Sequence, residues 1–196
     1  ASLAGPHNAE NAAAAAACLA ALGLAEDEIA EGMAGFAGLP HRLQTVAKHS
    51  GISFVNDSKA TNGVAAAKAL AAFDNVYWIA GGEAKEDGLG EAAGETANVA
   101  HAYLIGSAAQ AFAAELDGIV ETSLSGDLET ATTSAFADAS AASGTDGRDA
   151  TILLSPAAAS FDQFASFVAR GDAFTTIARR LTAEAGTAGV QGGAHA

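Results

Sequence analysis

The sequence predicts an α/β fold with a mostly parallel sheet, helices on both of its faces, and two short helices in front. Short apolar, partly β-branched runs alternate with helix-forming stretches along most of the chain. Each of the clearer apolar runs ends in a polar or glycine-rich segment. Such alternation is typical of parallel strands that are joined by helices packed on the sheet.

The individual elements follow from these patterns. Strands are predicted at 43–49, 52–56, 76–80, 101–105, 119–122 and 151–154. Helices are predicted at 63–73, 106–116, 128–142 and 173–185. The glycine-rich end of the chain, 186–196, is expected to be disordered.

The first 38 residues have a different composition. Strong helix formers, mainly alanine, fill 9–22, with Asn8 as a candidate N-cap and Gly23 as the stop. A second helix is predicted from Ala25 to Gly35. Two such helices bury too little area to form a domain alone, so we expect them to pack against the rest or against a region outside this chain.

The stretch 155–172 is the most informative part of the sequence. It follows a predicted buried strand, and Pro156 prevents that strand from continuing through the centre of a sheet. Phenylalanines then recur at helical spacing, which predicts a helix that begins at Ser160. At such a position the serine hydroxyl either caps the helix or faces a ligand.

Three polar segments are expected at the carboxyl edge of the sheet: Asp57–Asn62, Gly81–Lys85 and Ser155–Ser160. Each of them follows a predicted strand, and ligands of parallel α/β sheets bind at this edge. Backbone N–H groups at a strand-to-helix turn favour an anionic ligand there. The topology therefore predicts one ligand site built from three distant segments.

The charge distribution narrows the choice of partners. The 196 residues carry a formal net charge of −14, which argues against nucleic acid, because phosphate binding needs clustered Lys and Arg. No Lys or Arg lies between residues 86 and 147. Just before this acidic stretch stand five cations, Arg42, Lys48, Lys59, Lys68 and Lys85. This grouping favours an anionic small ligand.

Several other classes of protein are disfavoured. The single cysteine, Cys18, excludes an intramolecular disulfide and fits a reducing cytoplasm. No apolar run approaches the roughly 20 residues that span a bilayer, and no secretory signal is present, so we expect a cytoplasmic protein without membrane insertion. No Gly-x-Gly-x-x-Gly fingerprint or phosphate loop follows a predicted strand. The histidines show no metal-ligand spacing, and no catalytic triad pattern is present, so no metal ligand is expected here.

Three motifs occur together in one order: Leu-Pro-His-Arg at 39–42, Asn-Asp-Ser-Lys-Ala-Thr-Asn at 56–62, and Ser-Pro-Ala-Ala-Ala-Ser-Phe-Asp-Gln-Phe at 155–164. With them the chain resembles the D-glutamate-adding members of the Mur ligase family over nearly its whole length. The first motif is shared by related Mur ligases, and the other two are more specific. Gly-Pro-His-Asn at 5–8, with Asn11, resembles the end of the family's central ATPase domain.

The resemblance implies a division of the chain. Residues 1–38 would be the end of the central ATPase domain, 39–185 the C-terminal, amino-acid-binding domain with its Rossmann-like sheet, and 186–196 a tail. The family's phosphate loop, Mg²⁺ ligands and carbamylated lysine would lie in a missing part. On this expectation the isolated chain is inactive.

The resemblance also implies an ATP-dependent ligase of peptidoglycan precursor synthesis. ATP phosphorylates the terminal carboxylate of UDP-N-acetylmuramoyl-L-alanine, and the amine of D-glutamate attacks the acyl phosphate. The implied cofactors and partners are therefore ATP, Mg²⁺, D-glutamate and UDP-N-acetylmuramoyl-L-alanine, together with the missing N-terminal and central domains.

Matching positions imply roles for individual residues. The D-glutamate site would contain Thr61, Lys85, Ser160 and Phe167. The nucleotide site would contain Asn8 and Asn11 near adenine, Arg42 toward phosphate and Asp57 toward ribose. Lys59 would be the catalytic residue near the transferred phosphate, or else a structural partner of Asp57. Leu39 and Pro40 would form the hinge between domains.

Other interpretations share parts of this pattern. A folylpolyglutamate synthase-like protein or another Mur ligase would have the same architecture and ATP use with a different amino acid. A noncatalytic nucleotide-binding module would need only half of the site. A dehydrogenase is disfavoured by the absent glycine fingerprint.

Overall fold

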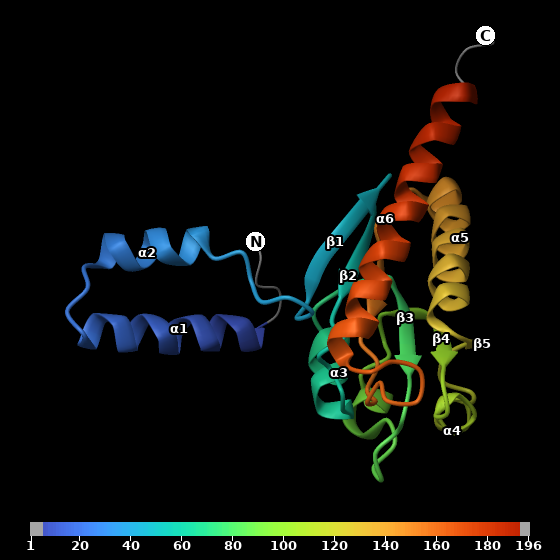
Figure 1. Cartoon of the computed structure of the whole chain (residues 1–196), viewed down its shortest axis with the longest axis horizontal. Coiled ribbons are helices and arrows are strands. Elements are labelled where there is room, and N and C mark those ends of the chain that lie inside the picture. The colour runs from blue at the N-terminus through green and yellow to red at the C-terminus, as the bar shows by residue number, and fades with distance from the viewer. Residues whose placement is uncertain (1–5, 193–196) are drawn as a thin grey trace.

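The α/β prediction is confirmed by the structure, a computed structural model that describes residues 6–192, with the side chains of 8–143 and 147–187. A two-helix hairpin projects from one side of an α/β body, and a single extended segment joins the two parts (Figure 1). None of the helices in this described part is long and apolar enough to cross a membrane.

The body is built on a six-stranded sheet in the order β1-β2-β6-β3-β4-β5. Its strands are β1 (Gln44–His49), β2 (Ile52–Asn56), β3 (Val76–Gly81), β4 (Val99–Ile105), β5 (Thr122–Gly126) and β6 (Ala150–Leu154). Only the pairing of β1 with β2 is antiparallel. Because β6 lies between β2 and β3, the loop after β6 is flanked by the loops after those two strands.

Helices cover both faces of the sheet. One face carries α3 (Gly63–Leu70), the 3₁₀ helix η1 (Gly90–Gly94) and α4 (Ala109–Glu115), and the other carries α5 (Leu128–Asp146) and α6 (Phe167–Gly192). Alternate residues of each strand point to opposite faces, which produces two separate cores. Trp78 and Phe112 belong to the first core, whereas Phe54, Ile152 and Phe174 belong to the second.

The prediction that a helix begins at Ser160 is wrong. Residues 155–166 form an irregular loop, and α6 begins at Phe167. Ser166 caps this helix, because its Oγ accepts the backbone N–H of Ala169 at 3.1 Å. At Ala159 the chain is held out of a helix, because this residue pairs with Glu83, in the loop after β3, in a β-bridge.

Two other boundaries differ from the prediction. The strand expected at 119–122 lies instead at 122–126, where β5 is an edge strand with a polar sequence and little apolar signal. Ile119, which suggested the earlier position, is 57% exposed in a turn after α4. α6 continues to Gly192, so the backbone is helical over the first seven residues of the expected tail, and 193–196 lie outside the described residues.

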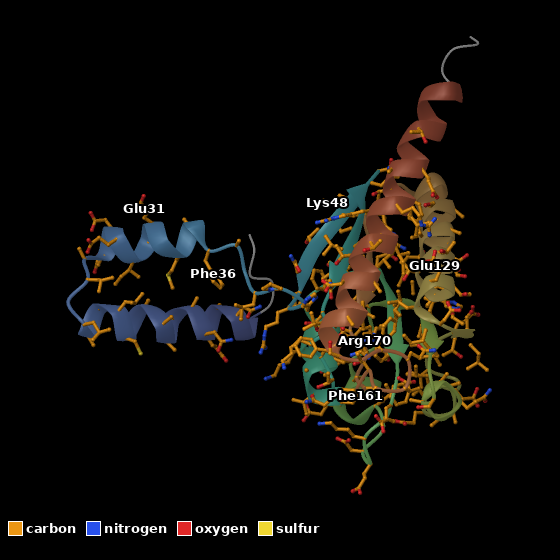
Figure 2. The ribbon with its side chains drawn as sticks, viewed as in Figure 1. Glu31, Phe36, Lys48, Glu129, Phe161 and Arg170 are labelled. Atoms are coloured by element: carbon orange, nitrogen blue, oxygen red, sulfur yellow. The ribbon has the colours of Figure 1, made fainter. Side chains whose placement is uncertain are left out.

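The hairpin consists of α1 (Pro6–Ala21) and α2 (Glu26–Gly35), which pack on each other. Asn8 is not the N-cap of α1, because the helix already begins at Pro6, a residue favoured at the first helical position. The hairpin does not pack against the sheet (Figure 1), so the first of its two expected packing arrangements is wrong. Glu31 lies on its outer side and Phe36 near its junction with the body (Figure 2).

Candidate active site

The loops after β2, β3 and β6 meet at the carboxyl edge of the sheet. The backbone N–H of Asp57, after β2, donates to the carbonyl of Leu154 at the end of β6, at 2.8 Å. After β3, Glu83 forms an antiparallel bridge with Ala159, and both of its backbone hydrogen bonds measure 2.9 Å. The predicted convergence of three polar segments is therefore confirmed.

A cavity of about 590 Å³ opens beside the end of β2, between the first turns of α1 and helix α3. Its lining includes every residue expected to bind nucleotide, and also the candidate catalytic lysine: Asn8, Asn11, Arg42, Asp57 and Lys59. Lys68 of α3 adds a third cation to the lining. Cationic, amide and carboxylate side chains from three separate segments thus surround one space, a combination that suits a nucleotide.

Asp57 is buried at the inner wall of this cavity. Its carboxylate accepts the backbone N–H of Leu43 at 3.2 Å and the hydroxyl of Ser155 at 2.9 Å. Burial raises the pKa of Asp57 to about 7, although these two hydrogen bonds and the charge of Arg42 act in the opposite direction. Asp57 therefore joins three segments: the entry to β1, the end of β2 and the loop after β6.

Lys59 links the cavity to the beginning of α6. Its Nζ lies 4.3 Å from the centroid of the Phe167 ring, a cation–π contact. The carbonyl of Phe167 accepts the hydroxyl of Ser58 at 2.8 Å, and the ring of His41 packs edge-on against Phe167 with centroids 6.1 Å apart. The candidate catalytic lysine and one of the D-glutamate candidates are therefore in direct contact.

Ser160 is 2% exposed, and its hydroxyl has no hydrogen-bond partner among the described residues. It does not cap a helix, so that alternative for its hydroxyl is wrong. Its carbonyl instead accepts the N–H groups of Gln163 and Phe164, at 3.2 and 2.7 Å, in a tight turn. Because a buried unpaired hydroxyl costs free energy, this arrangement suits a side chain that hydrogen-bonds to a bound ligand.

The remaining two D-glutamate candidates are placed differently from each other. Thr61 is half-buried in the loop after β2, two residues beyond Lys59, and its N–H donates to the carbonyl of Lys59 at 2.9 Å. Lys85 lies on an exposed loop after β3. Across the described part of the chain, no hydrogen bond or ion pair joins Lys85 to the other candidates. The structure does not bring Lys85 into the same cluster.

Sequence reasoning assigned no role to Arg170, which lies in the middle of the candidate site at the beginning of α6 (Figure 2). It is 1% exposed, and its guanidinium donates to atoms of the loops after β2 and β6 and to the carbonyl of Gly81 at the end of β3. A signal for its burial exists in the sequence: Arg170 precedes the buried residues Phe174, Ala178 and Leu181 at helical spacing.

The sequence is similar to a known protein family and to named proteins of two bacteria. The sequence model of a family described as "Mur ligase, glutamate ligase domain" matches residues 41–158. A protein of Caulobacter vibrioides named UDP-N-acetylmuramoylalanine–D-glutamate ligase is 48% identical over 189 residues, which cover 96% of this chain and 39% of that protein. A protein of the same name from Rhizobium meliloti is 51% identical over 172 residues, covering 88% of this chain and 36% of that protein.

A solved structure shares the fold. The crystal structure of UDP-N-acetylmuramate-alanine ligase from Thermotoga maritima matches with a TM-score of 0.64 at 13% sequence identity. The match covers 94% of this chain and 39% of that one. The chain thus spans about two-fifths of the length of the relatives that it matches. It belongs to the Mur ligase family, and its residues 41–158 match the family's glutamate ligase domain.

Proposed function

We propose that the chain carries the D-glutamate site and part of the ATP site of a cytoplasmic ligase that adds D-glutamate to UDP-N-acetylmuramoyl-L-alanine. The observation that carries this proposal is the position of Lys59. It lines the cavity that contains all the nucleotide candidates, and it also contacts Phe167 of the amino-acid cluster. One residue would thus connect the proposed nucleotide and amino-acid subsites, which a ligation reaction must bring together.

In the nucleotide cavity, Arg42 and Lys59 would bind phosphate oxygens, since both are cations that are free to approach a polyphosphate. Asp57 would accept hydrogen bonds from ribose hydroxyls. Asn8 and Asn11, from the first turns of α1, would line the adenine side. ATP supplies the phosphoryl group that turns a carboxylate, a poor electrophile, into a reactive acyl donor.

In the amino-acid cluster, the hydroxyls of Thr61 and Ser160 would donate hydrogen bonds to the carboxylates of D-glutamate. Phe167 would form the wall beside Lys59, and Lys85 would reach the site only after its exposed loop has moved. These groups would hold the amine of D-glutamate toward the acyl carbon. Positioning of this kind supplies much of the rate in a reaction between two substrates.

The reaction we propose has two steps. The terminal carboxylate oxygen of UDP-N-acetylmuramoyl-L-alanine attacks the γ-phosphorus of ATP, and ADP leaves. The amine nitrogen of D-glutamate then attacks the acyl carbon, loses a proton, and inorganic phosphate leaves as the C–O bond breaks.

We further propose Mg²⁺ as cofactor, but no group of three or more His, Cys, Asp or Glu among the described residues could hold it. No role for this chain's residues therefore depends on the metal.

The test uses a hybrid ligase in which this chain replaces the matching segment of the Caulobacter vibrioides relative. ADP release is measured with UDP-N-acetylmuramoyl-L-alanine as acceptor and D-glutamate, L-glutamate or L-lysine as the amine donor. We expect release that depends on D-glutamate. Thr61→Ala should raise the KM for D-glutamate, whereas Thr176→Ala, on the exposed side of α6, should not change it.

Each other outcome points to one of the alternatives. Equal release with L-glutamate or L-lysine would contradict the D-glutamate assignment and favour another ligase of this architecture. ATP binding without ADP release from any of the three donors would favour a noncatalytic nucleotide-binding module.

A further inference from the structure

We propose that Arg170 is a positioning residue that holds three loops in the arrangement that receives D-glutamate. This inference rests on the proposed function. It concerns a residue that contacts none of the candidate nucleotide groups by hydrogen bond, yet hydrogen-bonds to the loops after β2 and β6 and to the end of β3.

The guanidinium of Arg170 uses its full set of donors. Nε donates to the hydroxyl of Ser58 at 3.0 Å, and Nη2 donates to the Ser58 and Ala158 carbonyls at 3.0 and 3.1 Å. Nη1 donates to the carbonyls of Ala159 at 3.2 Å and Gly81 at 3.4 Å. An arginine has five N–H donors in a fixed planar fork. All five are therefore directed at the loops after β2 and β6 and at Gly81, where the loop after β3 begins.

The acceptors lie next to the candidate ligand groups. The Ala159 carbonyl belongs to the peptide that continues into Ser160, the residue with the buried unpaired hydroxyl. The Ser58 hydroxyl that accepts from Arg170 also donates to the carbonyl of Phe167. Arg170 therefore fixes the backbone on both sides of the cluster, and a small shift of its fork would displace Ser160 and Phe167 together.

The charge of Arg170 has no carboxylate partner within ion-pair distance in the part of the chain that the structure describes. Burial lowers the pKa of Arg170 to about 10, and the charge of Asp162 partly opposes this shift. A buried cation is costly unless it is compensated, and all the oxygens that accept hydrogen bonds from Arg170 are neutral. A bound dicarboxylate nearby would supply the missing negative charge.

Geometry at Gly82 supports the same conclusion. A Cβ added to Gly82 would lie 2.1 Å from the Ala159 carbonyl oxygen and 3.1 Å from Nη1 of Arg170. The backbone after β3 therefore passes directly against the guanidinium and the loop after β6. A side chain at position 82 would collide with the backbone of Ala159, so this close approach requires glycine.

The experiment measures KM for D-glutamate and for ATP in the hybrid ligase carrying Arg170→Lys or Arg170→Met. Lysine keeps the charge and loses the fork, and methionine loses both. We expect both variants to raise the KM for D-glutamate by roughly tenfold or more, with the KM for ATP changed by less than about threefold. Arg180→Lys and Arg180→Met, at an exposed position on the same helix, are the matched controls and should change neither constant.

A second arm separates positioning from general damage. Guanidinium ion added to the Arg170→Ala variant should replace the missing side chain and lower the KM for D-glutamate toward the parent value. Added methylammonium ion, which lacks the planar set of donors, should not. In a Ser58→Ala, Arg170→Lys double variant, the increase in the KM for D-glutamate should be smaller than the product of the increases in the two single variants. Both changes remove the same link to Phe167, so their effects should not multiply.

The outcomes distinguish the two proposals. A parent hybrid without D-glutamate-dependent release overturns the proposed function, and this inference with it. A D-glutamate-dependent parent whose Arg170→Lys variant keeps its KM overturns the inference alone. Equal increases in both KM values would show a general structural role and would also overturn it. If Arg170→Met does not fold, Arg170→Lys and the guanidinium arm decide.

Discussion

At the scale of single residues, Asp57 combines a place in the wall of the cavity with a buried carboxyl whose pKa is raised to about 7. The folded protein therefore keeps the proton on Asp57 up to near-neutral pH, whereas the unfolded chain releases it near 3.8. The stability from this group is fully present below about pH 4 and is lost as pH rises through about 7.

This difference predicts how the free energy of unfolding depends on pH. In urea unfolding of the chain between pH 4 and 8, the parent should lose stability relative to Asp57→Asn as pH rises, by at most about 4 kcal/mol. Asparagine is isosteric and stays neutral at every pH. Parallel curves for the two proteins would contradict the raised pKa.

Ser160 has a buried hydroxyl without a partner among the described residues, which we expect to cost stability and which we propose binds D-glutamate. Ser160→Ala removes a buried hydroxyl with no partner among the described residues, so the free energy of unfolding should stay the same or rise by up to about 1 kcal/mol. The same variant of the hybrid ligase should show a higher KM for D-glutamate. Urea unfolding and ADP-release kinetics provide the two measurements.

The control for this prediction is Ser155→Ala. Ser155 is equally buried, but its hydroxyl donates to Asp57 at 2.9 Å, so its loss should lower the free energy of unfolding by about 1–2 kcal/mol. A clear loss of stability in Ser160→Ala would mean that its hydroxyl has a structural partner, and would contradict its assignment as a ligand group.

At the scale of elements, one close approach fixes α3 against η1. A Cβ added to Gly63 would lie 2.0 Å from the carbonyl oxygen of Leu89, which is backbone and has little freedom to move. Gly63→Ala should therefore lower the free energy of unfolding by about 2 kcal/mol, and thermal unfolding measures this effect. Gly94, in η1, has no atom within 4 Å of its added Cβ. Gly94→Ala should be neutral or stabilising by up to about 1 kcal/mol, and an equal loss in both variants would contradict the packing argument.

The alternation of apolar runs and helix formers correctly predicted the α/β class and the strands that are buried on both faces. Strands β2, β3 and β6 consist mainly of apolar residues because helices cover both of their sides. β5 was misplaced because it is an edge strand with the polar sequence Thr-Ser-Leu-Ser-Gly, which carries no such signal.

The same reasoning failed in the loop after β6 for a different physical cause. The spacing of its phenylalanines imitates a helix, yet Phe161 is 70% exposed, and tertiary contacts keep the chain irregular until Phe167. Those contacts come from Arg170 and from the bridge to Glu83, which join segments far apart in the sequence. Local sequence patterns contain no information about such pairings.

At the scale of the whole molecule, the cavity that we propose for the nucleotide lies where the hairpin meets the body. Asn8 and Asn11 come from α1, whereas Asp57 and Lys59 come from the sheet edge. The segment between them, with Leu39 exposed, would act as the hinge that we expect from the sequence. Movement there would change the distance between the two halves of the cavity and leave the amino-acid cluster, which lies wholly within the body, unchanged.

The central claim is that this chain itself carries the site for D-glutamate. The most direct test is an NMR titration of the ¹⁵N-labelled chain with D-glutamate and, separately, with L-glutamate. We predict that D-glutamate shifts the amide signals of Thr61, Ser160 and Phe167, that L-glutamate does so more weakly, and that the hairpin signals stay in place. Shifts confined to the hairpin, equal shifts with both enantiomers, or no shift at millimolar concentrations would contradict the claim.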